Sequence, residues 1–424
     1  MVPPATKTPD GPYYLSNLDQ NIAVIVQTVY CFRAADSSSV SDVLRESLAN
    51  VLVHYYPLAG RLTISGEGKL AVDCTGDGAV FVEAEADCAM ADIGDVTEPD
   101  PSVLGKLVYS VPGAKNILEM PLLAAQVTKF TCGGFVLGLA INHCMFDGVG
   151  AMQFVNSWGK TARGLPLSLP PALDRAVLRA RDPPRLEFPH HEFAPVTGDE
   201  DDDNQDDGKA LLYRSFRFTP ASISRLKAMA AQPMEEEGVR RRACTTFEAL
   251  AGFVWSARTR ALGMGPSRRS KLLFAVDGRP RFAPPLPAGY FGNAIVLTSA
   301  SCAAGELAAP QVAVRLVRGA VEAVTDKYMR SAVDYFEATR ARPSLASTLV
   351  ITAWSRLPFR AADFGWGPPA AYGPAALPEK EVALFLSCGG GEEEGGGGGV
   401  RVLLGLPPAA MAEFQRLVEE VTEA

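Results

Sequence analysis

Apolar residues recur along this chain with two spacings, which predict strands and helices in turn. From Val40 to Tyr55 they recur at helical spacing, and the stripe stops at Pro57 and Gly60. Runs that are β-branched or alternate between apolar and polar residues predict strands. In the first part of the chain these predicted strands are residues 21–32, 70–73, 79–83 and 124–130, whereas residues 12–19 are expected to form a loop.

A continuous apolar run, residues 135–141, leads into His143. Asp147 and Gly148 then break the pattern, and apolar residues recur at helical spacing up to Trp158. The pattern predicts a buried strand, paired with the 124–130 strand, that delivers His143 to a turn with a helix behind it. An imidazole in that position suits proton transfer. The alternative is a core histidine with satisfied hydrogen bonds, because histidine is often partly buried.

The second part of the chain restarts after a change of composition. Residues 181–208 are Pro-rich and then acidic, which predicts a solvated linker because such a segment buries little apolar surface. Thr245 and Glu248 have the spacing of a capping box that opens a helix. Other predicted helices start at residue 222 or span 307–335 and 411–421, and the predicted strands are 211–218, 271–277, 294–298, 350–354, 382–386 and 400–406.

These elements predict an α/β protein with two domains. A chain of 424 residues is long enough for two cores. The expected division is an N-terminal domain at 1–180, an acidic crossover linker at 181–210 and a C-terminal domain at 211–424. The Gly- and Glu-rich segment 389–399 lacks the Gly-Lys-Ser/Thr of a phosphate loop, so we expect it to be a surface turn at the tip of a hairpin.

Composition excludes several classes of protein. A net charge of -8 argues against nucleic-acid binding. The eight cysteines are scattered singly, which argues against a metal site and against a disulfide framework and fits a reducing cytosol. The chain start lacks a signal-like apolar segment, and no apolar run reaches the roughly 18 residues that span a membrane. We therefore expect a cytoplasmic protein without a membrane span, and nothing in the sequence suggests an oligomer, so we expect a monomer.

Four motifs in this order resemble those of the plant BAHD acyl-CoA-dependent acyltransferases. They are Tyr56-Pro57-Leu58-Ala59-Gly60-Arg61, His143-Cys144-Met145-Phe146-Asp147-Gly148, Tyr290-Phe291-Gly292-Asn293 and Asp363-Phe364-Gly365-Trp366-Gly367. The resemblance implies two similarly built α/β domains of the chloramphenicol-acetyltransferase type, with mixed sheets flanked by helices and a crossover between them. It also implies an active-site channel between the domains, open at both faces, with His143 midway along it.

Within that family, residues 141–167 and 335–344 look like the ω-hydroxyacid and fatty-alcohol hydroxycinnamoyl transferases. The resemblance implies feruloyl-CoA or p-coumaroyl-CoA as co-substrate, an ω-hydroxy fatty acid or fatty alcohol as acceptor, and no permanently bound cofactor. Shikimate, quinate, a monolignol or an amine is the alternative acceptor. The segment 339–345 does not obviously match the arginine register of shikimate-using relatives, which counts against shikimate. A non-catalytic member that binds a small molecule is a third hypothesis.

The expected chemistry centres on His143, which as a neutral general base takes the acceptor's hydroxyl proton and returns it to the leaving thiolate. No acyl-enzyme is needed, because both substrates meet in one channel. Cys144 beside the base is the alternative, as a covalent nucleophile. Asp147 could orient His143 as in a triad. The resemblance implies instead that Asp147 turns away and pairs with Arg279 in a structural role.

Thr352 and Trp354 lie two positions apart on a predicted strand, so they face the same side. The resemblance implies that they line the site near the oxyanion and the acceptor. The alternative is that both residue types are simply favoured in strands. Asp363 and Gly365 are implied to be structural and far from His143.

The start of the helix at Thr245 and Thr246 offers free N–H groups to a CoA phosphate. Basic clusters flank this helix in the sequence, one at residues 240–242 and one at Arg268, Arg269 and Lys271. We therefore expect the threonines and the second cluster to contact CoA. The alternative for the clusters is a solvated charged face.

Overall fold

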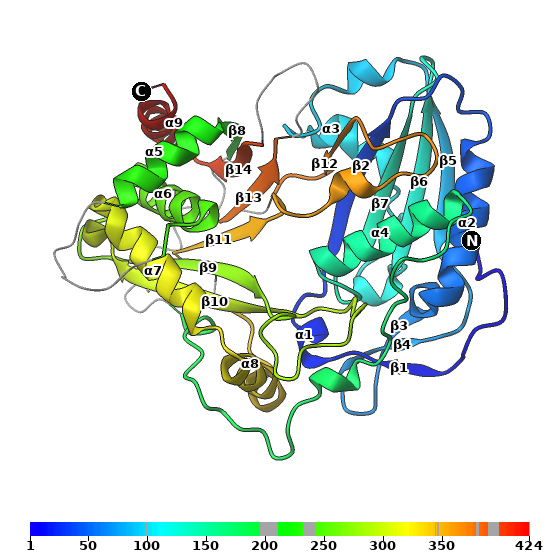
Figure 1. The fold of residues 1–424 in the computed structure, drawn as a ribbon, viewed down its shortest axis with the longest axis horizontal. Helices are drawn as coiled ribbons and strands as arrows, with labels where there is room; N and C mark the ends of the chain where they lie inside the picture. The colour runs from blue at the N-terminus through cyan, green and yellow to red at the C-terminus, as the bar shows by residue number, and fades with distance from the viewer. Residues whose placement is uncertain are drawn as a thin grey trace.

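The computed structural model describes every residue except 99, 196–210, 232–241, 344, 346, 379–380, 389–397 and 424. The described residues form two large mixed sheets with helices on them, side by side, and one small sheet (Figure 1). The α/β prediction is therefore confirmed. Within the described ranges, no helix is long and apolar enough to cross a bilayer.

The first sheet has five strands and carries the segment that leads to His143. Its spatial order is β12 (Ala371–Pro374), β2 (Ile25–Phe32), β7 (Phe135–Asn142), β6 (Leu123–Phe130) and β5 (Val80–Ala86). Every residue of β7 is buried, and β6 and β7 pair antiparallel as expected. The helices α2 (Val40–His54) and α4 (Gly148–Ala162) pack together on this sheet, where Trp158 Nε1 donates to Ser47 Oγ at 2.9 Å.

The second sheet has six strands, all from the C-terminal half. Its order is β10 (Ile295–Ala303), β9 (Arg269–Asp277), β11 (Thr348–Ala353), β13 (Val382–Ser387), β14 (Val400–Leu406) and β8 (Leu212–Phe218). β13 and β14 form the predicted hairpin, whose tip at 389–397 lies outside the described residues. The hydrophobic core against this six-stranded sheet includes side chains of α5 (Pro220–Ala230), α6 (Thr246–Ala261), α7 (Pro310–Ala323) and α9 (Pro408–Thr422).

Two sequence predictions of local structure are wrong. Residues 12–19, expected to be a loop, contain β1 (Pro12–Tyr14) and α1 (Asn17–Gln20), and β1 pairs with β4 (Leu70–Asp73), which also pairs with β3 (Arg61–Ile64). The single helix expected at 307–335 is split into α7 and α8 (Asp326–Thr339). Thr325 caps α8 by accepting a bond from Tyr328 N–H at 3.3 Å, and no Gly or Pro marks this break in the sequence.

The remaining elements are short helical turns on the connections. They are η1 (Tyr56–Ala59), η2 (Met90–Ile93), α3 (Pro101–Leu104), η3 (Gly105–Leu107), η4 (Ile117–Glu119), η5 (Ala176–Leu178), η6 (Ala304–Ala308) and η7 (Phe359–Ala361). The first, η1, starts at the predicted end of α2, where Pro57 lies inside the turn and Gly60 follows it.

The first part of the expected linker is largely exposed, as predicted, but it is tied to the second half of the molecule at a few residues. Arg181 Nε donates to Asp334 Oδ2 at 2.6 Å. His190 is buried, with its two ring nitrogens 2.6 Å from Glu192 Oε1 and 2.8 Å from Ser331 Oγ. The sequence suggests that Arg181 and His190 face solvent, because their partners Asp334 and Ser331 lie 153 and 141 residues further along the chain. The acidic part of the segment, from residue 198 to 208, lies outside the described residues.

Candidate active site

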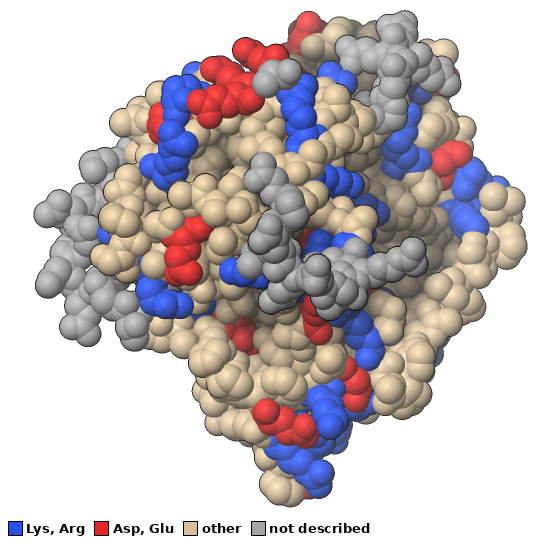
Figure 2. Space-filling view, turned by 60° about the vertical axis from the view of Figure 1, so that its left-hand side comes forward, with Lys and Arg blue, Asp and Glu red and all other residues tan. Residues whose placement is uncertain are grey.

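A cavity of about 880 Å³ lies where the two large sheets meet. Its lining combines residues of both halves, and most of it is apolar. The first half contributes residues of β2 and the start of α4, and the second half contributes residues of β9, β10, β11 and the start of α6. The molecule is hollowed on the face shown in Figure 2, where Lys and Arg side chains lie beside the hollow.

His143 lies directly after β7 and lines this cavity. Its backbone is held on both sides: the N–H donates to Val24 O at 2.8 Å, and the carbonyl accepts from Asn293 Nδ2 at 2.9 Å. The ring's Nδ1 is buried, which leaves Nε2 as the nitrogen that a substrate in the cavity can reach. Burial lowers the pKa of His143, so the imidazole is neutral at pH 7 and can accept a proton.

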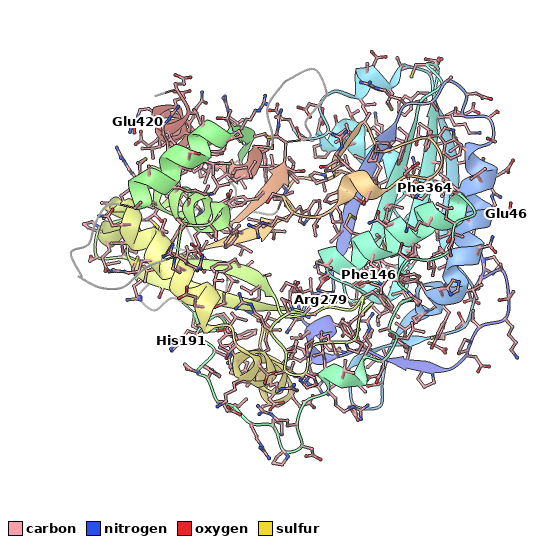
Figure 3. The ribbon with its side chains drawn as sticks, in the orientation of Figure 1. Glu46, Phe146, His191, Arg279, Phe364 and Glu420 are labelled. Atoms are coloured by element: carbon pink, nitrogen blue, oxygen red, sulfur yellow. The ribbon has the colours of Figure 1, made fainter. Side chains whose placement is uncertain are left out.

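The carboxylate of Asp147 is turned toward the second half of the molecule. It accepts two bonds from Arg279, both at 2.9 Å, and one each from the N–H groups of Gly150 at 3.0 Å and Ala294 at 2.9 Å. The Gly150 bond caps α4. Arg279 lies between the two large sheets (Figure 3). The expected pair of Asp147 with Arg279 is therefore present, and neither oxygen of Asp147 bonds to His143 in the part of the chain described. This geometry contradicts the triad alternative.

Cys144 is fully buried and does not lie among the described residues that line the cavity. Burial raises the pKa of its thiol to about 12, so the nucleophilic thiolate is scarcely populated at neutral pH. The structure therefore contradicts the alternative in which Cys144 is a covalent nucleophile.

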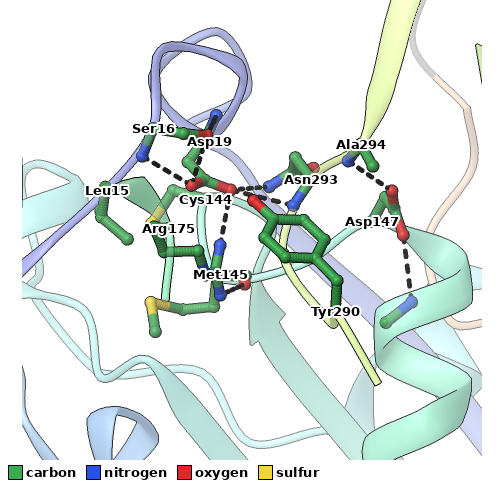
Figure 4. A network of polar contacts seen from close by, with 12 residues as sticks. Leu15, Ser16, Asp19, Cys144, Met145, Asp147, Arg175, Tyr290, Asn293 and Ala294 are labelled. Atoms are coloured by element: carbon green, nitrogen blue, oxygen red, sulfur yellow. Dashed lines mark hydrogen bonds and ion pairs between the residues drawn. The ribbon is translucent and has the colours of Figure 1, made fainter. Parts of the chain in front are cut away.

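A buried ionic network lies beside the loop that follows β7 (Figure 4), and sequence reasoning missed it. Asp19 and Arg175 have no exposed side-chain surface and pair at 2.8 Å. Arg175 also donates to the carbonyl of Met145 at 2.6 Å, which anchors the loop between β7 and α4. Asp19 accepts two bonds from Asn293, both at 2.9 Å. The motif at 290–293 pointed to Asn293 as a site residue. Asp19 and Arg175 lie in no motif, so nothing in the sequence indicated that they are buried at the site.

Thr352 and Trp354 come to the cavity from the opposite half to His143. Thr352 lies near the end of β11, between β9 and β13, and Trp354 follows the strand. Both side chains are half-buried, and the indole packs against Phe359 with ring centroids 5.8 Å apart. The structure thus brings both residues to the same cavity as His143. Their assignment to the oxyanion stays a prediction.

The predicted CoA contacts separate into two groups. Thr245 and Thr246 line the cavity at the start of α6, together with Arg242. Thr245 forms the expected capping box with Glu248: each backbone N–H donates to the other's side chain at 3.1 Å. Arg242 reaches the same carboxylate at 2.5 Å. A cationic group therefore lies at the start of this helix, where Arg242 and the Thr245 N–H both donate to the Glu248 carboxylate.

The structure does not bring the second basic cluster to the cavity. The Nζ of Lys271 is committed to the carbonyls of His191, Glu192 and Ala194, at 3.1, 2.9 and 2.8 Å. Arg268 and Arg269 donate to hydroxyls outside the cavity, those of Ser347 at 3.2 Å and Ser301 at 2.8 Å. We therefore leave these three residues out of the proposed CoA site, because none of them lines the cavity.

Asp363 and Gly365 belong to a tight loop packed on α4. Asp363 accepts from Arg163 Nη1 at 3.1 Å and from the N–H groups of Gly365 and Gly367 at 2.8 and 3.0 Å. Gly365 has φ +113°, a conformation that glycine adopts without steric cost. The loop is so close to α4 that a side chain at Gly159 would meet the Asp363 carbonyl. Neither Asp363 nor Gly365 lines the cavity, in keeping with their expected structural role.

Known proteins match this arrangement over nearly the whole chain. The Transferase family model matches residues 1–421. The omega-hydroxypalmitate O-feruloyl transferase of Arabidopsis thaliana is 58% identical over 98% of this chain and 90% of its own length. The fatty alcohol:caffeoyl-CoA acyltransferase of the same plant is 54% identical over 99% and 96%. The chain therefore belongs to the Transferase family, its resemblance to the BAHD acyltransferases is confirmed, and it is an acyltransferase of class EC 2.3.1.

Solved structures share the fold. The crystal structure of vinorine synthase matches with a TM-score of 0.75 and 23% identity, over 100% of this chain and 97% of that one. That of F. graminearum TRI101 complexed with coenzyme A and deoxynivalenol matches with a TM-score of 0.79 and 17% identity, over 96% and 97%. The predicted fold class is therefore confirmed.

Proposed function

We propose that this enzyme transfers a hydroxycinnamoyl group, such as feruloyl or p-coumaroyl, from CoA to the hydroxyl of an ω-hydroxy fatty acid or a fatty alcohol. The observation that carries the proposal is the position of His143, a neutral imidazole that opens onto a cavity lined by both halves of the molecule. The names and the 58% and 54% identity of the two plant relatives support the substrate class. CoA is a co-substrate here, and no permanently bound cofactor is proposed.

The lining of the cavity suits an aliphatic acceptor. Apolar side chains from both sheets face it, including Val24, Val26, Leu273, Ile295 and Leu297. Burying a methylene group of a fatty chain against such a surface is worth about 0.8 kcal/mol. A small polyhydroxylated acceptor such as shikimate or quinate gains little from this surface, and the shikimate transferase of Nicotiana tabacum is only 37% identical.

In the proposed reaction, His143 removes the proton from the acceptor hydroxyl as its oxygen attacks the thioester carbonyl. The tetrahedral intermediate then collapses, the C–S bond breaks, and the protonated imidazole returns its proton to the leaving thiolate. Such general-base help contributes about 10²- to 10⁴-fold. We propose no acyl-enzyme, because both substrates are expected to meet at one imidazole.

The second half of the molecule supplies the other proposed contacts. The Thr352 hydroxyl and the Trp354 indole N–H donate to the oxyanion of the intermediate. The N–H group of Thr246 at the start of α6, with the Thr245 side chain and the Arg242 guanidinium beside it, binds a phosphate of CoA, because a helix start attracts anions; the Thr245 N–H itself donates to Glu248. Asp147 and Arg279 hold the two halves together at the site, and Asp363 and Gly365 shape the loop on α4.

We also propose that the enzyme is a cytosolic monomer with the domain division given above, 1–180 and 211–424. All eight cysteines are free, as expected in a reducing compartment. The cavity and its proposed catalytic groups come from one chain, so a second copy is not needed to complete the site. β12 from the C-terminal half nevertheless completes the first sheet, so the two domains share a strand.

The test is turnover with a panel of acceptors at fixed feruloyl-CoA. Thiol release is measured together with ester formation on 16-hydroxypalmitate, hexadecanol, shikimate, quinate, coniferyl alcohol and tyramine. We expect esters of the two fatty substrates and loss of thiol release in His143→Ala. Turnover on shikimate or quinate in place of the fatty acceptors contradicts the proposed acceptor class. No turnover with any acyl-CoA favours the non-catalytic binding protein.

A further inference from the structure

The orientation of the His143 ring needs a partner other than Asp147, whose carboxylate is engaged by Arg279. In a base that works through one nitrogen, the other nitrogen fixes the tautomer through its hydrogen bond. Nδ1 of His143 is buried and makes no hydrogen bond of ordinary geometry with any described residue. A buried polar atom of this kind points to a partner held close by.

Asn293 supplies a matching atom. Its Nδ2 donates to the His143 carbonyl at 2.9 Å, so the two residues are in contact. Its Oδ1 is also buried and also makes no hydrogen bond of ordinary geometry with the described residues. Two buried polar atoms, one able to donate and one able to accept, thus belong to two residues that are in contact through the Asn293 side chain and the His143 backbone. Burial lowers the pKa of His143, and the backbone carbonyl of His143 itself, the charge of Asp147 and hydrogen bonding with the Asn293 side chain oppose this lowering, in that order.

The amide of Asn293 cannot turn freely, because its nitrogen atoms are fixed. Asn293 has no exposed surface, and its backbone N–H and its Nδ2 both donate to Asp19 Oδ1 at 2.9 Å (Figure 4). Asp19 is held in turn by Arg175 at 2.8 Å and by Ser16 N–H at 2.8 Å. With Nδ2 committed to Asp19 and to the His143 carbonyl, Oδ1 is left as the acceptor of this side chain.

We propose that Asn293 is a positioning residue for the general base: it fixes the His143 backbone through Nδ2 and accepts the Nδ1–H proton at Oδ1, which leaves Nε2 unprotonated toward the cavity. The amide thereby takes the orienting place that Asp147 would have in a triad. An amide can orient the imidazole in this way without adding a negative charge to that of Asp147 near the base. This inference rests on the proposed function, in which His143 accepts the hydroxyl proton.

The kinetic test compares Asn293→Ala with Asn17→Ala. Asn17 is a close match, because it is also fully buried, its Nδ2 also donates two bonds, at 2.9 and 2.8 Å, and its Oδ1 is also buried and unpaired among the described residues. Its bonds go to α8 and not to His143. We expect kcat of Asn293→Ala to fall about 10- to 100-fold with KM for feruloyl-CoA within about 2-fold. We expect Asn17→Ala to lower thermal stability while keeping kcat.

A spectroscopic test does not depend on turnover. The chain has four histidines, so ¹⁵N-histidine labelling gives few imidazole signals, and the His143 signal is the one missing in His143→Gln. We expect the Nδ1–H tautomer in the unmodified enzyme and a mixture of tautomers in Asn293→Ala. An Nε2–H tautomer in the unmodified enzyme overturns the proposal. So does an Asn293→Ala variant whose kcat equals that of Asn17→Ala. Failure of the acceptor panel alone leaves the tautomer result standing and counts against the proposed substrates only.

Discussion

The ion pair between Asp147 and Arg279 gives the sharpest test of how the site is built. The perturbation is Asp147→Asn, which keeps the shape of the side chain and removes its charge. Among the described residues, the four bonds that the Asp147 carboxylate accepts come from N–H donors on Arg279, Gly150 and Ala294. An amide has one oxygen and one NH₂ group, so in the variant an N–H donor must face at least one of these N–H donors. The loss therefore includes both a charge pair and hydrogen bonds.

The expected magnitude follows from burial. The side chain of Asp147 is 2% exposed and that of Arg279 is 17% exposed. Removing one partner of a buried pair costs about 3–5 kcal/mol. Arg279 keeps a bond to Asp277 at 3.0 Å, so we expect the lower end, about 3 kcal/mol. If each half unfolds as a unit of roughly 200 residues, this corresponds to a fall in Tm of about 6–12 °C.

The assay measures Tm by scanning fluorimetry and kcat at a temperature well below the Tm of the variant. We expect Asp147→Asn to keep kcat within about 10-fold, whereas His143→Ala loses about 10²- to 10⁴-fold. Asp277→Asn is the control, because Asp277 also pairs with Arg279 but is 41% exposed, and its loss is expected to cost no more than about 1 kcal/mol. An Asp147→Asn variant with unchanged Tm and the kcat of His143→Ala would show that Asp147 acts on the imidazole, and would refute the structural role.

Three further predictions follow from burial at and near the site. Because burial lowers the pKa of His143, kcat/KM should stay level as the pH drops below 6.5 and fall only as the pH passes through the lowered pKa, and an acid limb centred above pH 6.5 contradicts this. Stability should fall earlier, between pH 6.5 and the lowered pKa, since the unfolded chain binds the proton first. Cys144→Ala should keep kcat within about 3-fold, measured by thiol release, since a buried thiol with a pKa of about 12 takes no covalent part; loss of turnover would restore the nucleophile alternative. Lys271→Met should lower the free energy of unfolding in urea by roughly 1–3 kcal/mol, because three carbonyls lose their donor, with KM for acyl-CoA unchanged; a tenfold rise in KM would make Lys271 a CoA contact.

The parts of the fold that sequence could predict are those set by local pattern. The apolar run before His143 became β7, and the capping-box spacing at Thr245 gave the start of α6. The strands that were missed, β1, β3 and β12, are 3 or 4 residues long, too short to show a period. β12 is a strand only because it pairs with β2, with Tyr372 opposite Tyr30. No local pattern in the sequence can show a pairing between segments so far apart.

The candidate site was predictable where a residue lies within a motif or on a strand. The positions of His143, Thr352 and Trp354 at one cavity agree with the sequence reasoning. The buried pair of Asp19 and Arg175 was not predictable, since charged residues in polar segments are normally solvated. The predicted contact of Lys271 with CoA also depends on remote partners. A lysine in a basic cluster suggests a ligand contact, but in the structure its Nζ donates to carbonyls of residues 191–194.

The contacts of the loop after β7 explain why the site needs both halves of the chain. His143 and Asp147 come from the first half, yet Asn293 bonds to the carbonyl of one and Ala294 to the carboxylate of the other. Arg279 adds two charge-assisted bonds across the same boundary. The base is thus placed by backbone and carboxylate contacts that the first half cannot make alone. A change that loosens the 279–294 segment should therefore reduce catalysis by His143 even where the cavity keeps its lining.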